Sequence, residues 1–124
     1  MNSQSIKKIN FSDKFDKISK YWSPKIIGEL NDYQFKVAKF KDDFIRHNHP
    51  ETDEAFIVIE GEIYIDFDDK TEIITAGEMI VVPKGVYHKP YSKKEAKVLM
   101  IEPKGTVNTG DIVNELTLSS DNWI

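Results

Sequence analysis

The sequence contains no cysteine among its 124 residues. Disulfide bonds, thiol catalysis, and zinc-ribbon or iron–sulfur sites are therefore excluded. A chain of this length can still bury a core large enough for one domain without such cross-links. Hydrophobic residues make up 40%, an ordinary globular value. We therefore expect a single folded domain that is held together by its core.

Long hydrophobic runs are also absent. The longest cover residues 55–59 and 98–101, whereas a membrane-spanning helix needs roughly 20 apolar residues. The first eleven residues include two lysines, but no apolar stretch follows them, so we expect no signal peptide. We predict that the protein has no membrane partner and is cytoplasmic.

Neither sign of charge dominates the chain. It carries 17 basic and 21 acidic residues, well interspersed, for a formal net charge of −4. No stretch is basic enough to indicate binding to nucleic acid or to an anionic membrane. We therefore predict a small-molecule ligand or substrate and no nucleic-acid partner.

One short helix is predicted over residues 11–21. Ser12 is a candidate N-cap, and Pro24 ends any helix that reaches it. The apolar residues of this segment recur at helical spacings, at Phe11, Phe15, Ile18 and Trp22.

From Lys25 onward, short β segments alternate with turn residues every eight to twelve positions. In the first of them, Tyr33, Phe35 and Val37 alternate with polar neighbours, as expected for a half-buried strand. This pattern predicts an all-β fold, an antiparallel barrel or sandwich. The other clear strands are predicted at residues 54–59, 63–67, 71–75, 79–82 and 97–102.

The three histidines of the chain all belong to one pattern with a glutamate. His47 and His49 are two residues apart and would share one face of an extended segment. Glu54 begins a largely apolar strand, where a carboxylate needs a partner, and His88 follows much later. Three imidazoles and a carboxylate suit a divalent transition metal better than Ca²⁺ or Mg²⁺. The alternative is a surface histidine cluster beside an acidic loop.

The spacing of these residues resembles the two motifs of the cupin superfamily. The first is His47-x-His49, four residues, Glu54, six residues and Gly61. The second is Gly77, five residues, Pro83-x-Gly85, two residues and His88. Two structural positions depart from the family pattern, because Lys41 and Ser92 stand where glycine and asparagine are usual.

The resemblance implies a double-stranded β-helix, or jelly-roll barrel, with a metal inside one mouth. It also implies His47, His49, Glu54 and His88 as the metal ligands. With the predicted helix, it divides the chain into an N-terminal helical cover segment (1–24), a barrel domain (25–118) and a C-terminal tail (119–124). The metal would be Fe, Mn, Ni, Zn, Cu or Co, because imidazole-rich sites accept all of them.

Residues 22–26 and 101–111 resemble a subgroup of small bacterial cupins that is often labelled mannose-6-phosphate isomerase-like. A shared barrel does not fix a reaction, so we take this label as a statement about the fold alone. The true sugar-phosphate isomerases of the superfamily are larger and carry further ligand and phosphate-binding residues that this sequence lacks.

Three functions are compatible with these patterns. The first is a metalloenzyme with dioxygenase- or isomerase-type chemistry, in which Glu54 serves as the catalytic base. The second is a non-catalytic, metal-dependent module that binds a small molecule. The third is a structural barrel without metal, in which the four side chains would hydrogen-bond one another.

Candidate pocket residues and a candidate interface complete the prediction. Trp22, Ile26 and Ile27 make an unusually apolar start. They would either cover the barrel of the same chain or contact a second subunit in a homodimer. Five side chains could line a ligand pocket, although core packing explains each of them as well: Tyr33, Phe35, Phe56, Tyr64 and Met100.

Overall fold

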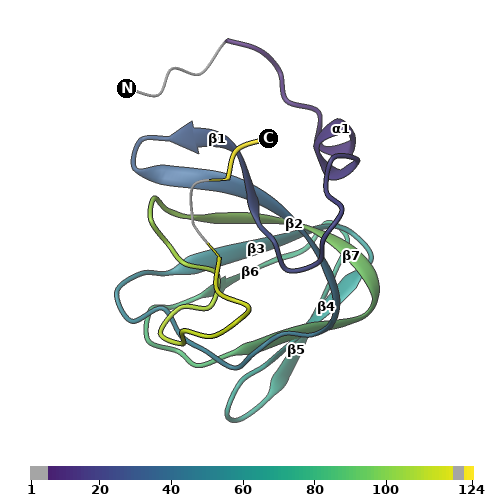
Figure 1. Ribbon diagram of the computed structural model, residues 1–124. Coiled ribbons are helices and arrows are strands. Elements are labelled where there is room, and N and C mark those ends of the chain that lie inside the picture. Colours follow the sequence, from purple (N-terminus) through teal and green to yellow (C-terminus); the bar gives the residue numbers. More distant parts are fainter. Residues whose placement is uncertain (1–5, 119–121) are drawn as a thin grey trace.

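The computed structural model describes residues 6–118 and 122–124. Residues 1–5 of the predicted cover segment and residues 119–121 of the predicted tail lie outside the described part. The helix and strands are arranged as Figure 1 shows. Their bounds are Phe11–Phe15 (α1), Lys25–Leu30 (β1), Tyr33–Asp43 (β2), Glu54–Glu60 (β3), Glu62–Asp66 (β4), Thr71–Thr75 (β5), Met79–Val82 (β6) and Lys89–Pro103 (β7).

The strands form an antiparallel sheet that folds over on itself around β7 (Figure 1). Strand β7 pairs with β2 along most of its length. Its C-terminal half also pairs with β3, while its N-terminal half pairs with β4. One long strand therefore belongs to both halves of the sheet, which face each other. The predicted all-β jelly-roll fold with one short helix is confirmed.

The main core lies between the two halves of the sheet. Its largest side chains include Phe40, Phe56, Ile63 and Ile65, each at most 2% exposed. Burying an aromatic or branched aliphatic side chain of this size contributes about 1.5–3 kcal/mol. The core therefore supplies the stability that a cysteine-free chain needs.

A second cluster lies on the outer face of the sheet, beneath α1. Phe15 and Ile18 pack there against Ile27, Val37 and Leu99. The segment after α1 continues across the barrel. Within the described residues, no helix reaches the length and apolar character needed to cross a bilayer.

Trp22, Ile26 and Ile27, which suggested either a cover or a subunit interface, are packed within their own chain. Trp22 stacks on Phe40 and Phe44, with ring centroids 4.2 and 4.8 Å apart. Ile26 and Ile27 are 1% and 6% exposed. The structure thus favours the interpretation in which this segment covers the barrel.

The helix is shorter than predicted, because it ends at Phe15 instead of continuing to residue 21. Its N-cap is Asn10, whose side chain accepts a hydrogen bond from the Asp13 amide, and not Ser12. Beyond the helix, Tyr21 forms a backbone bridge with Lys39 of β2. This pairing requires extended backbone, and a five-residue helix has little stability of its own to oppose it.

The strand predicted at Tyr33, Phe35 and Val37 is part of β2, but these side chains do not point into the barrel. Tyr33 is 48% exposed, while Phe35 and Val37 belong to the outer cluster beneath α1. Gln34 and Lys36 are buried instead, at 4% and 3% exposure. Because side chains alternate along a strand, a shift of one residue exchanges the two faces. Here the outer face is apolar because α1 covers it, and the inner face is polar.

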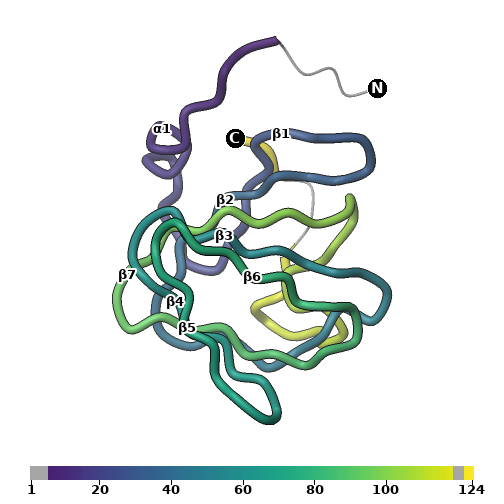
Figure 2. Tube along the Cα trace, turned by 180° about the vertical axis from the view of Figure 1, so that it is seen from behind, coloured from purple at the N-terminus to yellow at the C-terminus, as the bar shows by residue number. Residues whose placement is uncertain are grey.

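After β7 the chain folds back across one mouth of the barrel, as the yellow-green segment in Figure 2 shows. The Asp111 amide donates to the Asn48 carbonyl at 3.0 Å, and the Asp111 carboxylate accepts from the Asn48 amide at 2.9 Å. The Tyr87 hydroxyl donates to the same carboxylate at 2.9 Å. We call residues 104–118 the mouth segment.

Candidate metal centre

Two of the three histidines face each other across an isolated antiparallel bridge. The His47 amide donates to the His88 carbonyl at 3.0 Å, and the His88 amide donates to the His47 carbonyl at 2.8 Å. Such a pair places both side chains on the same face, and the two ring centroids are 4.4 Å apart. The Gly85 amide also donates to the His49 carbonyl at 2.9 Å, which fixes the third histidine to the same region.

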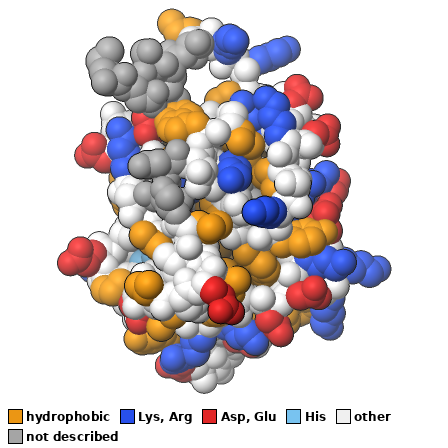
Figure 3. Space-filling view, viewed as in Figure 1, with side chains coloured by type: hydrophobic (Ala, Val, Ile, Leu, Met, Phe, Trp, Pro, Cys, Tyr) orange, Lys and Arg blue, Asp and Glu red, His pale blue; other side chains and the backbone are white. Residues whose placement is uncertain are grey.

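Glu54, the first residue of β3, completes the group. One possible ligand atom from each of His47, His49, Glu54 and His88 lies within 4.8 Å of the others. The exposed fractions of these residues are 2%, 6%, 3% and 0%. The structure therefore brings together the four predicted residues and places them inside the barrel, which disfavours the alternative of a surface cluster. Only a small area of histidine is visible in Figure 3.

Backbone carbonyls orient two of the imidazole rings. Nδ1 of His47 lies 2.9 Å from the Ile45 carbonyl oxygen, and Nδ1 of His88 lies 2.9 Å from the Val86 carbonyl oxygen. A carbonyl can only accept, so each Nδ1 carries a hydrogen, and in the neutral ring Nε2 keeps its lone pair. This is the arrangement that metal-binding histidines use, because the second nitrogen then fixes the ring.

Among the described residues, the side-chain atoms of this group that face the interior have no hydrogen-bond partners. Nε2 of His49 and Nε2 of His88 lie 3.2 and 3.5 Å from Oε1 of Glu54. Within the described part of the chain, none of these three buried atoms has a hydrogen-bond partner. Buried polar atoms without partners are costly, and acceptors that converge on one point repel each other. A cation at that point would satisfy all of them, so the residues fit a divalent transition metal.

The protonation states suit metal binding. Burial, together with the neighbouring His88, lowers the pKa of His47 to about 4, against the partial opposition of the Ile45 carbonyl. Burial alone would raise the pKa of Glu54, but the neighbouring side chains of Glu102, His49 and His88 outweigh it and hold that pKa well below its usual range. At neutral pH the site thus presents a neutral imidazole and a carboxylate, the forms that bind metals.

A second buried carboxyl group, which the sequence analysis missed, lies against Glu54. Glu102 is 1% exposed, and burial together with the negative charge of Glu54 raises its pKa well above the usual range. The raised pKa favours the protonated form of Glu102 at neutral pH. Nζ of Lys36 donates to Oε1 of Glu102 at 2.8 Å and to the Thr106 carbonyl at 3.2 Å. Alternation from Val98 would have placed Glu102 on the inner face.

A small cavity adjoins the centre. Its volume is about 20 Å³, which is enough for roughly one water-sized molecule. His47 and Glu54 form part of its wall. The other walls are largely apolar and come from Trp22, Pro24, Phe40, Phe44, Phe56, Pro90, Met100 and Asn108.

The five predicted pocket residues are distributed unevenly. Phe56 and Met100 line the small cavity. Tyr33 lines a separate open groove, which it shares with His49 and the mouth segment. Phe35 packs in the outer cluster, and Tyr64 stacks on Tyr91 with ring centroids 5.1 Å apart. These last two side chains therefore belong to neither the cavity nor the open groove.

Comparison with known proteins places these features in a family. The cupin domain family matches residues 35–102. The protein YdbB of Bacillus subtilis is 40% identical over 79 residues, covering 63% of this chain and 70% of YdbB. A germin-like protein, subfamily T member 2, of Arabidopsis thaliana is 32% identical over 81 residues. That match covers 61% of this chain and only 37% of the plant protein.

Solved structures agree with the sequence comparison. A cupin-2 domain-containing protein from Shewanella frigidimarina is 53% identical, with a TM-score of 0.76, and the match covers 77% of this chain and 93% of that one. Protein NMB1881 from Neisseria meningitidis is 35% identical, with a TM-score of 0.72, and the match covers 78% and 99%.

Proposed function

The chain belongs to the cupin domain family, and on that premise we propose that it is a metal-dependent protein acting on a small polar molecule. The ligands of the metal are His47, His49, Glu54 and His88. The proposed activity is of the dioxygenase or isomerase type. The proposal includes membership of the mannose-6-phosphate isomerase-like subgroup, supported by residues 22–26 and 101–111. A cytoplasmic location remains a prediction from composition.

One observation carries this proposal: three buried polar atoms, Nε2 of His49, Nε2 of His88 and Oε1 of Glu54, converge without a hydrogen-bond partner among the described residues. A structural barrel without metal would need these side chains to satisfy one another, and they do not. When bound, a divalent transition metal would supply Lewis acidity toward a carbonyl or hydroxyl group, or activation of O₂ if it is Fe(II).

The residues of the chain would orient the metal ligands, exclude water and hold a proton. The Ile45 and Val86 carbonyls fix the rings of His47 and His88. Glu54 is ionised and can accept a proton from the substrate, and the buried carboxyl group of Glu102 lies close enough to influence its ionisation. Two coupled carboxyl groups that differ in protonation are a common arrangement for acid–base chemistry. The cavity of about 20 Å³ favours a small reacting group.

Metal content tests the proposal. The protein should be purified without an affinity tag, and its metals measured by elemental analysis before any are added. We expect close to one transition metal per chain. His47→Ala, His88→Ala and Glu54→Gln should each lower this content at least about tenfold, since even outer-shell changes cost 10–100-fold in affinity.

Glu72→Gln is the matched control for Glu54→Gln, because Glu72 is an exposed carboxylate that pairs with Lys70 at the surface. It should leave the metal content unchanged. Metal contents that are equal in the wild type and in all three site variants, with circular dichroism showing folded proteins, would refute the proposal.

The small volume of the cavity favours a second candidate function, a non-catalytic binding module. The mouth segment covers the site, and the cavity beneath it has room for roughly one water-sized molecule. Turnover by the metal-loaded protein can be measured against diols, hydroxy acids and sugar phosphates. Product formation supports the enzyme, whereas thermal shifts with these compounds and no product support the binding module.

A further inference from the structure

Three buried polar side chains form one row across the inner face of the sheet. Gln34 of β2 pairs with Glu102 of β7. On the other side of β7, Ala55 of β3 pairs with Ile101. The antiparallel register then brings their neighbours, Glu54 and Glu102, opposite each other. Opposite residues on neighbouring strands have Cβ atoms about 4.5–5.5 Å apart, so Glu102 stands beside the metal ligand Glu54.

Lys36 holds Glu102 from the next inward position of β2. It lies two residues after Gln34 and therefore on the same face, at a diagonal position that a long side chain can bridge. Its ammonium nitrogen lies 2.8 Å from Oε1 of Glu102, and the two side chains are 3% and 1% exposed. The same nitrogen donates to the Thr106 carbonyl of the mouth segment at 3.2 Å. The ammonium group thus fixes one oxygen of Glu102.

The other oxygen of Glu102 is not explained by the fold. Within the described part of the chain, Oε2 of Glu102 and Oε1 of Gln34 are both buried without a hydrogen-bond partner. The Gln34 amide nitrogen donates elsewhere, to Oε2 of Glu29 at 2.9 Å. A buried carboxyl group that is half satisfied costs free energy, and an apolar pair at positions 36 and 102 would avoid that cost. Its presence therefore indicates a role in the site.

The orientation of Glu54 suggests that role. Its Oε1 lies 3.2 Å from Nε2 of His49 and 3.5 Å from Nε2 of His88, so this oxygen faces the metal position. A glutamate side chain has several rotatable bonds, and only one of its orientations does this. Groups that orient a ligating carboxylate typically change metal affinity by about 10–100-fold. Glu102, on the strand beside Glu54, is placed to restrict its orientation.

We propose that Glu102 is a positioning residue, anchored by Lys36, that keeps Oε1 of Glu54 directed at the imidazoles of the metal centre. The inference rests on the proposed function, because it requires a metal that Glu54 binds. The mouth segment belongs to the anchor, since Thr106 supplies the second acceptor of the Lys36 ammonium group.

Cobalt(II) tests this role, because its visible absorption reports the number and arrangement of its ligands. Chelator-treated protein is titrated with Co²⁺, and the dissociation constant and the spectrum are measured together. Lys36→Met/Glu102→Leu replaces the anchor by an apolar pair and should retain most of the stability. We expect its dissociation constant to rise at least about tenfold, with an altered spectrum. Glu102→Gln keeps an oxygen for Lys36 and should return both readouts toward the wild type.

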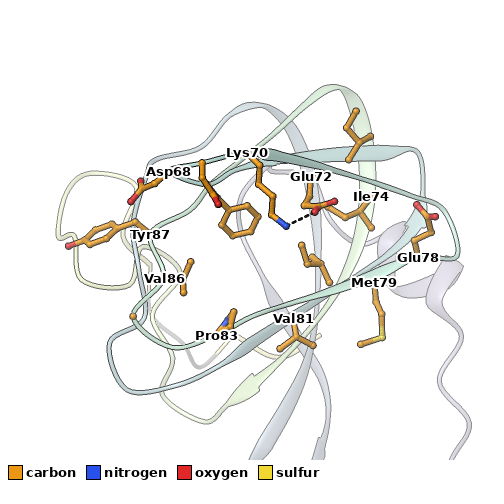
Figure 4. Close-up of a pocket in the computed structure, with 15 residues that line it drawn as sticks. Asp68, Lys70, Glu72, Ile74, Glu78, Met79, Val81, Pro83, Val86 and Tyr87 are labelled. Atoms are coloured by element: carbon orange, nitrogen blue, oxygen red, sulfur yellow. Dashed lines mark ion pairs between the residues drawn. The ribbon is translucent and has the colours of Figure 1, made fainter.

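The pair Lys70–Glu72, which lines the surface groove drawn in Figure 4, offers the matched control. Lys70→Met/Glu72→Leu makes the same substitutions at side chains that are 59% and 42% exposed. It should leave the Co²⁺ affinity and spectrum unchanged. Circular dichroism shows which variants are folded. If the double variant at positions 36 and 102 does not fold, Glu102→Leu alone replaces it in the comparison with Glu102→Gln.

Two failures can be told apart. A folded Lys36→Met/Glu102→Leu protein with the affinity and spectrum of the wild type would overturn the positioning role and leave the proposed function intact. Equal spectra and affinities in Glu102→Leu and Glu102→Gln would overturn it as well. A wild type that binds no Co²⁺ would overturn the proposed function, and the positioning role with it.

Discussion

Protonation of His47 makes the free energy of unfolding of the chain depend on pH. Its pKa is about 4 in the folded protein, against 6.5 for a histidine that is free of its surroundings. Between these values the unfolded chain binds a proton that the folded chain does not, so the free energy of unfolding falls as the pH falls. For the metal-free protein, this residue contributes a loss of about 2 kcal/mol between pH 7 and pH 5.

Urea unfolding of chelator-treated protein at the two pH values checks this prediction. His47→Gln removes the titrating group, so its free energy of unfolding should depend less on pH by about that amount. The same dependence in both proteins would contradict the assigned environment of His47.

The buried contact between Lys36 and Glu102 leads to a second prediction at this scale. Glu102→Leu removes the nearest hydrogen-bond acceptor of the buried Lys36 ammonium, and we expect a loss of about 1–3 kcal/mol in the free energy of unfolding. The double variant Lys36→Met/Glu102→Leu should recover most of that loss, because an apolar pair replaces both partners. Chemical denaturation of the four proteins of this cycle measures the coupling.

The exposed pair Lys70–Glu72 provides the control for this cycle. Its nitrogen and oxygen are 2.9 Å apart, but the side chains are 59% and 42% exposed. Glu72→Gln should therefore change the free energy of unfolding by less than about 1 kcal/mol. If the double variant at positions 36 and 102 is no more stable than Glu102→Leu, the two buried groups are not coupled.

At the level of elements, the sequence predicted where strands lie better than which faces they bury. Alternation of Tyr33, Phe35 and Val37 identified β2 correctly. However, Phe35 and Val37 pack in the outer cluster beneath α1 and not inside the barrel. The inner positions of the same strand hold Gln34 and Lys36, next to a charged site. Local alternation cannot reveal which face a helix covers, because that depends on residues distant in sequence.

The mouth segment illustrates the same limit. Residues 103–111 are rich in residue types that favour turns, but the position of this segment over the candidate metal centre depends on contacts with Asn48 and Tyr87. Gly110 fits there because it has no side chain. A Cβ at this position would lie 2.9 Å from Cδ2 of His47 and overlap the Asn48 carbonyl.

Gly110→Ala should therefore lift the mouth segment from the site. Gly105→Ala is the matched control: both glycines have positive φ, 57° and 84°, but a Cβ at Gly105 would meet nothing within 4 Å. Each change costs on the order of 1 kcal/mol in backbone strain, and Gly110→Ala adds the clash. Hydrogen exchange of residues 104–118 should accelerate in Gly110→Ala well beyond Gly105→Ala. Equal exchange would show that the segment does not pack on His47.

For the whole molecule, the two cupin motifs were sufficient to predict the barrel and the convergence of its four inward-facing residues. The jelly roll was what the resemblance of these motifs to the family implied. Glu102 and Lys36 escaped prediction because each lies singly in a strand, and only the pairing of β2 with β7 brings them together. Residues within the two motifs were therefore predicted, whereas partners outside the motifs required the fold.

The metal centre joins parts of the chain that are distant in sequence: the segment 47–49, the start of β3 and the residue before β7. A metal that binds only this folded arrangement stabilises it by mass action, by about 2.7 kcal/mol at 100 times the dissociation constant. For a chain of this size, that predicts a rise of roughly 10 °C in the melting temperature. Calorimetry of chelator-treated protein with and without added metal measures this rise.

The rise should be absent in Glu54→Gln and unchanged in Glu72→Gln, whose carboxylate is exposed. It should also shrink as the pH falls toward about 4, the pKa of His47 in the folded protein, because protons then compete with the metal for the imidazole nitrogen. A metal-dependent rise that stays constant from pH 7 to pH 4, or that survives Glu54→Gln, would mean that the cation binds elsewhere on the molecule. The converging acceptors of His49, Glu54 and His88 would then need another explanation.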